Sequence, residues 1–235
     1  MDPLRLLRRL TFAVLVGFAP AARAADVPPR GGIDASPSLK TPTTASAKLG
    51  AGGFLSRWLV LEPIPGDARV TDSAVRAAAQ REYFPNQLSV LPRPGDKVTV
   101  NGADYAWHAV DSSRHNVNLY HFAYFLGKPT SNVVFWGVTI VDSPEEIPHV
   151  RLAVGSNAGS VWWVNDREVV ALYGDRQTSI DDGVSRKLTL RKGPNIVRFL
   201  VVQNGGMVDC CARFLDANDQ PLTGLTQTLA LPSRP

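Results

Sequence analysis

The chain has 235 residues, with 25 Lys and Arg side chains against 21 Asp and Glu, which gives a formal net charge of +4. Residues 1–24 hold four of the basic side chains and one of the acidic ones, so the rest of the chain is almost neutral. Nucleic-acid binding needs a basic surface that a nearly neutral chain does not provide, which excludes that class of function.

The first 24 residues have the pattern of a secretory signal peptide. A basic start precedes an apolar run over 10–19, which is too short to span a bilayer. Pro20 ends this run, and the Ala-Arg-Ala sequence at 22–24 supplies the small residues that signal peptidase recognises. No later stretch is long and apolar enough for a membrane anchor. We therefore expect an exported protein, periplasmic or extracellular, with no membrane span.

Composition divides the remainder into three parts. Residues 25–53 are rich in Pro, Ser, Thr, Gly and Ala, and such a segment cannot bury enough apolar surface to offset its ordering entropy. This predicts a flexible linker. Residues 54–222 predict one folded domain, and residues 223–235 predict a peripheral tail.

From residue 54 onward, short apolar runs separated by turn residues predict a series of strands. The predicted strands are 58–61, 97–100, 105–109, 121–126, 133–141, 149–154, 160–164, 169–173, 184–190, 196–203 and 212–215. The segment 72–81 predicts the one short helix, capped by Thr71 or Asp72. The turns at Asn101-Gly102 and Asn165-Asp166 favour tight hairpins. Strands without alternating helices predict an all-β fold, a two-sheet antiparallel β-sandwich.

The two cysteines, Cys210 and Cys211, are adjacent. Neighbouring Cα atoms lie about 3.8 Å apart, which is shorter than a disulfide prefers. A strained bridge between them stays open, but two free thiols on opposite faces of a strand are favoured.

Several motifs between residues 152 and 219 follow one another in an order that is typical of a known family of modules. An aromatic strand ends in Trp162-Trp163-Val164-Asn165-Asp166, a Leu-x-x-Gly-x-Asn turn spans 190–195, and a closing Arg-Phe-Leu-Asp follows at 213–216. The opening at 58–65, Trp-Leu-Val-Leu-Glu-Pro-Ile-Pro, fits the same scheme. This order resembles the galactose-binding-like, jelly-roll accessory modules of secreted carbohydrate-active enzymes, of the acetylxylan-esterase-associated type.

The resemblance implies a jelly-roll sandwich whose partners are a polysaccharide or glycan, and a carbohydrate-active enzyme. It implies no cofactor. Many modules of this kind hold a structural calcium ion with loop carboxylates, so Asp175, Asp181 and Asp182 keep that alternative open. The family's usual Asn-Gly is Asn165-Asp166 here, which favours a looser turn.

Catalytic patterns are missing from the sequence. There is no G-x-S-x-G block for a serine esterase, and Ser156 has no partner histidine at a telling spacing. The four histidines lack metal-site spacing, so we expect no metal site. The adjacent carboxylates Glu145 and Glu146 fit a solvated loop better than a glycosidase pair. The sequence thus favours a protein that is not an enzyme.

Sugar binding uses flat aromatic faces together with side chains that read hydroxyl groups. The loop 173–182 has this mixture and follows the aromatic strand, so the candidate carbohydrate-binding residues are Trp163, Tyr173, Arg176 and Asp181. An ordinary polar loop, whose Arg and Asp residues pair with one another, is the alternative. The first hypothesis is a secreted non-catalytic module that binds a glycan or supports a polysaccharide-active enzyme. The others are a small acetylxylan-type esterase with an unrecognised motif, and a protein–protein interaction module.

Overall fold

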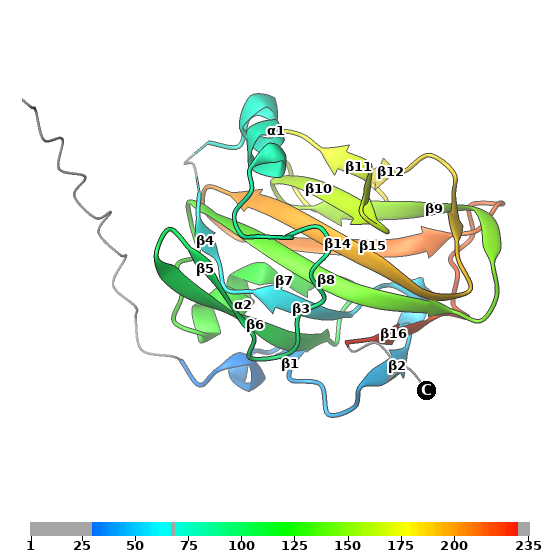
Figure 1. The fold of residues 1–235 in the computed structure, drawn as a ribbon, viewed down its shortest axis with the longest axis horizontal. Helices are drawn as coiled ribbons and strands as arrows, with labels where there is room; N and C mark the ends of the chain where they lie inside the picture. Colours follow the sequence, from blue (N-terminus) through cyan, green and yellow to red (C-terminus); the bar gives the residue numbers. More distant parts are fainter. Residues whose placement is uncertain (1–29, 67–68, 230–235) are drawn as a thin grey trace, which may run out of the picture.

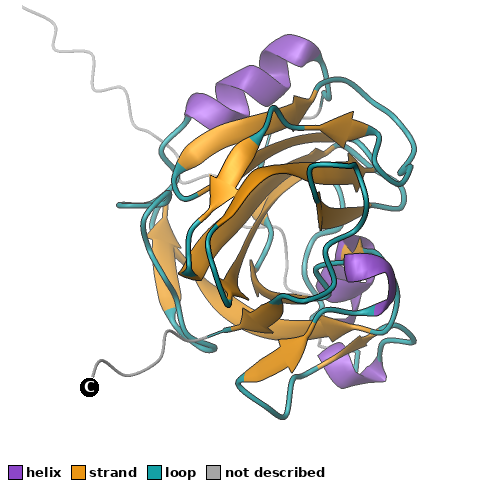
Figure 2. Cartoon of the chain, turned by 90° about the vertical axis from the view of Figure 1, so that its right-hand side faces the viewer, coloured by secondary structure: helices purple, strands orange, loops and turns teal. Residues whose placement is uncertain are grey.

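The computed structural model describes residues 30–229 apart from 67 and 68, so the predicted signal peptide at 1–24 lies outside the described residues. Two sheets pack face to face, and every strand pairing among the described residues is antiparallel. Figure 2 shows the strands curving around the interior, with the α-helices at the periphery. The predicted all-β, two-sheet antiparallel sandwich is confirmed.

The larger sheet runs through the whole molecule (Figure 1). In spatial order its main strands are β1 (Leu39–Lys40), β6 (Ala103–Ser112), β3 (Arg57–Leu61), β8 (Val133–Ser143), β14 (Gly193–Gln203), β10 (Gly159–Val164) and β11 (Arg167–Leu172). Its other strands are β2 (Ser46–Lys48), β4 (Ile64–Pro65), β5 (Lys97–Val100) and β16 (Thr226–Thr228). The predicted strand at 133–141 is therefore central, as its Val, Phe, Trp and Ile content indicates.

The smaller sheet covers one face of the larger one. Its strands, in order, are β12 (Gly183–Val184), β9 (Ile147–Ser156), β15 (Asp209–Leu215) and β7 (Val117–Asn118), with β13 (Leu188–Leu190) also paired to β9. The predicted strand at 184–190 is thus divided in two. The interruption spans 185–187 and begins at Ser185, whose Oγ accepts a hydrogen bond from Leu152 N at 2.9 Å and whose own N donates to Leu152 O.

The central strands are buried on both faces. The face toward the smaller sheet forms the inner core, which contains Trp58, Trp162 and Phe199. The opposite face forms a second, outer core, which contains Trp136 and Trp163. Every residue of β10 is buried, so the side chains that alternate along this strand pack into the inner and the outer core in turn.

Helix α1 (Asp72–Gln80) closes the outer core and confirms the predicted helix at 72–81. Thr71 Oγ1 caps it by accepting a hydrogen bond from Ala74 N at 3.2 Å. Figure 1 shows α1 above the start of β10, where the helix approaches the sheet closely. A Cβ on Gly159 would lie 2.3 Å from Val75 Cγ2, so this contact requires glycine.

The prediction of a strand at 121–126 is wrong, because this segment belongs to helix α2 (Leu119–Phe125). Asn118 Oδ1 accepts a hydrogen bond from His121 N at 2.7 Å and caps the helix. The buried side chains Leu119, Phe122 and Ala123 have helical i, i+3, i+4 spacing. The aromatic content that suggested a strand here packs against the inner core as a helix.

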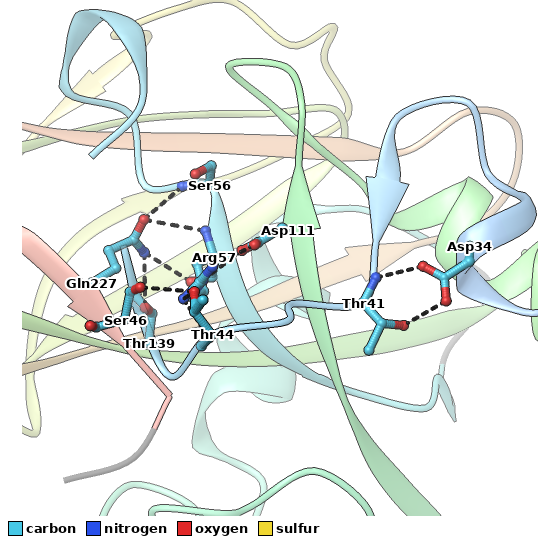
Figure 3. Close-up of polar contacts among 9 residues, drawn as sticks. All are labelled: Asp34, Thr41, Thr44, Ser46, Ser56, Arg57, Asp111, Thr139 and Gln227. Carbon is cyan, nitrogen blue, oxygen red and sulfur yellow. Dashed lines mark hydrogen bonds and ion pairs between the residues drawn. The ribbon is translucent and has the colours of Figure 1, made fainter. Parts of the chain in front are cut away.

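The segment 30–53 is part of the fold, whereas its composition predicted a flexible linker as far as residue 53. Leu39 is fully buried and pairs with Ser112 in the sheet. Asp34 orders the preceding turn, since its carboxylate accepts hydrogen bonds from Thr41 N at 2.7 Å and Thr41 Oγ1 at 3.1 Å (Figure 3). Backbone pairing at a sheet edge thus holds a segment with few apolar side chains.

Residues 223–229 are likewise not peripheral, since β16 pairs with both β2 and β8. Gln227 is 1% exposed, and Figure 3 shows its amide bridging three segments. Its Oε1 accepts hydrogen bonds from Ser56 N (2.9 Å) and Arg57 N (3.2 Å). Its Nε2 donates to Arg57 O (2.8 Å) and Thr139 Oγ1 (2.9 Å).

Arg57 continues this polar cluster toward the N-terminal segment. Its guanidinium forms a two-pronged ion pair with Asp111, with N–O distances of 2.7 and 2.6 Å. It also donates to Thr44 O at 2.8 Å. The two ends of the described chain are therefore joined to the central strands through buried polar groups, whose loss would leave donors and acceptors unpaired.

We predict that Gln227→Ala lowers the free energy of unfolding by about 2 to 3 kcal/mol, because it leaves several buried polar groups without partners. Gln220 is exposed and makes only local contacts, so Gln220→Ala is the matched control. Urea unfolding of the full chain measures both. Equal stability of the two variants would show that residues 223–229 contribute little to the fold.

Candidate functional site

Three loops meet at one end of the sandwich because of strand register. Gly159, the first residue of β10, pairs with Val202 near the end of β14. Ser160 pairs with Leu172, the last residue of β11. Since antiparallel neighbours run in opposite directions, the turn at 157–158 and the loops 173–182 and 204–208 leave the sheets at the same end.

These loops surround a shallow depression of about 370 Å³ that is open to solvent. Its lining consists of Asn157, Asp175, Arg176, Gln177, Gly205, Gly206 and Met207. Amide, carboxylate and guanidinium groups thus lie beside Met207, which is 52% exposed. The depression combines hydrogen-bonding groups with an apolar contact surface.

Arg176 is held in place within the loop. Its Nη1 donates to Asp182 Oδ2 at 2.7 Å, and its Nη2 donates to Tyr173 O at 2.6 Å. Its main-chain carbonyl accepts a hydrogen bond from Ala158 N at 3.2 Å, which joins the loop to the neighbouring turn. The guanidinium is therefore fixed before any ligand arrives, while the side chain remains 28% exposed.

Asp209 holds the same loop in place through hydrogen bonds. Its carboxylate accepts hydrogen bonds from Thr178 Oγ1 and from Asn116 Nδ2. Its main-chain carbonyl accepts one from Asn157 N at 3.0 Å. A single residue at the start of β15 thus connects loop 173–182, the turn at 157–158 and the segment before β7.

The loop also packs directly on the backbone of β9. A Cβ on Gly155 would lie 1.9 Å from Ser179 O and 3.1 Å from Cys211 Sγ, so this close approach requires glycine. Both cysteines are free and buried, in agreement with the favoured prediction. Burial raises the pKa of the Cys211 thiol to about 12, with a further contribution from the Asp209 carboxylate.

The four residues predicted for sugar binding fall in different places. Tyr173 and Arg176 are in contact, as described above. The ring of Tyr173 is covered by the Arg76 guanidinium, 3.9 Å from its centroid. Trp163 is 4% exposed in the outer core and stacks on Trp136, with ring centroids 5.5 Å apart. Its ring is therefore part of the packing between sheet and helix.

Asp181 is not among the residues that line the depression, and it pairs with Arg213 on β15, with Oδ1 at 3.0 Å from Arg213 Nε. The hydrogen bond to this carboxylate raises the pKa of Arg213 above its ordinary value. The pairs Arg176–Asp182 and Arg213–Asp181 show that Arg and Asp residues do pair within and beside the loop, as the polar-loop alternative expects.

Sequence reasoning missed Asn157 and the segment 205–207, although both line the depression. They lie far from loop 173–182 in the sequence, and only the strand register brings them together. The signal that could have indicated them is the exposed Met207 directly after Gly205-Gly206 between two predicted strands.

The hydroxyl of Ser156, the serine considered as an esterase nucleophile, is enclosed by the fold. Ser156 is fully buried, and its Oγ donates to Ala158 O at 3.0 Å and contacts Ser160 Oγ at 2.8 Å. Substrate therefore has no access to this hydroxyl in the folded chain.

The described ranges, 30–66 and 69–229, contain no group of three or more His, Cys, Asp or Glu side chains placed to hold a metal ion. In the same ranges, no helix has the length and apolar character needed to span a bilayer.

Comparison with known proteins gives distant structural likenesses. No protein-family model matches the chain, and no curated protein matches it. A PA14 sugar-binding domain from an RTX adhesin aligns over 72% of this chain and 94% of its own, with 12% identity and a TM-score of 0.43. The PA14 domain of the antifreeze protein MpAFP aligns over 71% of this chain and 90% of its own, with 14% identity and a TM-score of 0.39.

A β-glucosidase from Kluyveromyces marxianus in complex with glucose aligns over 68% of this chain but only 16% of its own length, with 15% identity and a TM-score of 0.36. At these scores the likenesses carry no argument about the family of this chain. None of the three is an acetylxylan-esterase-associated module, so that finer resemblance stays a prediction.

We predict that Gly155→Ala loosens loop 173–182, because the added methyl group would occupy the position of Ser179 O. Amide hydrogen exchange should become faster across 175–182. Gly50→Ala is the control, since a Cβ there meets only ordinary contacts at 3.9 Å. Unchanged exchange in the Gly155→Ala chain would contradict the close packing of the loop on β9.

Proposed function

We propose that this chain is an exported, non-catalytic module that binds a glycan in the depression beside Arg176. The observation that carries the proposal is the lining itself. Asn157, Asp175, Arg176 and Gln177 supply donors and acceptors of the kinds that read sugar hydroxyl groups, and Met207 supplies an apolar contact.

The form of the depression also favours a glycan. It is shallow and open, so part of a long polymer can lie across it without the chain end having to enter. Its polar groups are held by Asp209 and by the bonds of Arg176, so little conformational freedom is lost on binding. An open site of this kind suits retention of a polymer better than enclosure of a reacting bond.

Protein binding is the second candidate, and a specific observation favours it. Among the described residues, the large apolar side chains with the greatest exposure are Ile180 (47%), Val184 (41%) and Met207 (52%). Ile180 and Met207 belong to the loops around the depression, and Val184 lies on β12 close by in sequence. A carbohydrate-active enzyme is the partner we propose for this surface, in line with the export signal expected at 1–24.

The test is binding to a panel of soluble and insoluble polysaccharides that includes xylan and cellulose. We expect Arg176→Ala to weaken binding about tenfold or more, because a hydrogen bond to a charged group contributes roughly 1.5–3 kcal/mol. Arg191 is exposed and remote from the depression, so Arg191→Ala is the matched control and should bind as the parent does.

The melting temperatures of both variants must be compared, because Arg176 also stabilises its own loop. A folded Arg176→Ala chain that binds glycans as tightly as the parent would refute the site. A parent chain that binds no polysaccharide would refute the glycan function and leave protein binding as the remaining candidate.

A further inference from the structure

A pair of stacked tyrosines lies on helix α2. The rings of Tyr120 and Tyr124 have centroids 5.9 Å apart and planes inclined by only 18°. Both side chains are partly exposed, whereas Leu119 and Phe122 on the same helix are buried. The helix therefore anchors itself through its buried face, and Tyr120, which also packs against the inner core, remains partly exposed beside Tyr124.

The helix that carries this tyrosine pair is joined through its backbone to one of the loops that line the depression. Tyr120 N donates a hydrogen bond to Val208 O at 3.0 Å, so the first turn of α2 is joined to the residue that follows Met207. The helix cap Asn118 lies directly opposite Asp209 in the pairing of β7 with β15. Asp209 in turn holds Thr178 in loop 173–182. The tyrosine pair and the polar lining of the depression are thus attached to the same short stretch of backbone.

The tyrosines are held in position without a ligand. The guanidinium of Arg30 lies 4.1 Å from the ring centroid of Tyr124. Arg30 N also donates to Phe125 O at 3.0 Å, which fixes the N-terminal segment against the helix. A cation over one ring and a second ring stacked beside it limit the rotation of both tyrosines. Little entropy is lost when such a rigid aromatic surface meets a ligand.

We infer that the tyrosine pair is a second subsite of the glycan site, so that the ligand is an oligosaccharide chain longer than a single sugar. This inference rests on the proposed glycan binding. Pyranose rings with mostly equatorial hydroxyls expose flat C–H faces, which pack on aromatic rings. One unit of such a chain binds in the polar depression beside Arg176, the chain passes over Met207, and a later unit lies on Tyr120.

The test measures affinity as a function of chain length. Xylose and xylo-oligosaccharides up to the hexasaccharide, and glucose with the matching cello-oligosaccharides, are titrated into the full chain by calorimetry. For the parent we expect affinity to rise with length. Tyr120→Ala should weaken binding of the longer oligosaccharides about three- to tenfold, in line with the strength of an aromatic contact, and leave binding of the monosaccharide unchanged.

Two further variants separate the aromatic contact from a general loss of structure. Tyr120→Phe keeps the ring and should bind the longer oligosaccharides as the parent does. Tyr105 is a partly buried tyrosine on β6 that packs against the outer core, whereas α2 packs against the inner core, so Tyr105→Ala is the matched control and should also bind like the parent.

The outcomes distinguish this inference from the proposed function. Affinity that does not depend on chain length, or a folded Tyr120→Ala chain with the parent's affinity for the hexasaccharide, would overturn the second subsite. Glycan binding through Arg176 would then still stand. If the parent binds no saccharide of either series, both the glycan function and the second subsite fail together.

Discussion

The burial of the central strands on both faces is the constraint on which the rest of the structure depends. Strand β10 has no exposed residue, and two adjacent residues of this strand, Trp162 and Trp163, pack into two different cores. Neither face of the sheet at this point is free to offer an aromatic platform to a ligand. The proposed binding site therefore uses the loops at the strand ends, where the register of β10, β11 and β14 brings three loops together.

The same constraint explains how the margins of the molecule are built. The larger sheet is completed by short segments from both ends of the described chain, which pair with its longer strands and with each other. Gln227 and Arg57 secure those segments with buried hydrogen bonds and an ion pair to Asp111. At the opposite end, Asp209 performs the corresponding role for the loops around the depression. Both polar clusters position backbone segments that have little apolar surface of their own.

The elements with a clear local signal could be predicted from the sequence. The hairpin at Asn101-Gly102 has positive φ at both residues, and the predicted helix at 72–81 begins at its expected cap. The helix at Leu119–Phe125 was missed because an aromatic-rich run satisfies strand propensity as well as a helical core pattern. The short strands β1, β2 and β16 were missed because backbone pairing, rather than apolar side chains, holds them in place.

The candidate site could be predicted only in part, for a related reason. The loop 173–182 stood out by its side-chain types, and Arg176 does line the depression. Trp163 was chosen because strand alternation places it on the outer face of the sheet. What covers that face is α1 together with the segment around Phe84, and no local pattern near Trp163 encodes that packing. Met207 and Asn157 join the site through long-range register alone.

The most direct test of this account is backbone amide NMR of the protein during titration with the tightest-binding soluble oligosaccharide. The account predicts that chemical-shift changes concentrate at 157–158, 173–182 and 204–208 and extend to the start of α2. Changes confined to other parts of the surface, with these loops unaffected at saturation, would contradict the placement of the binding site.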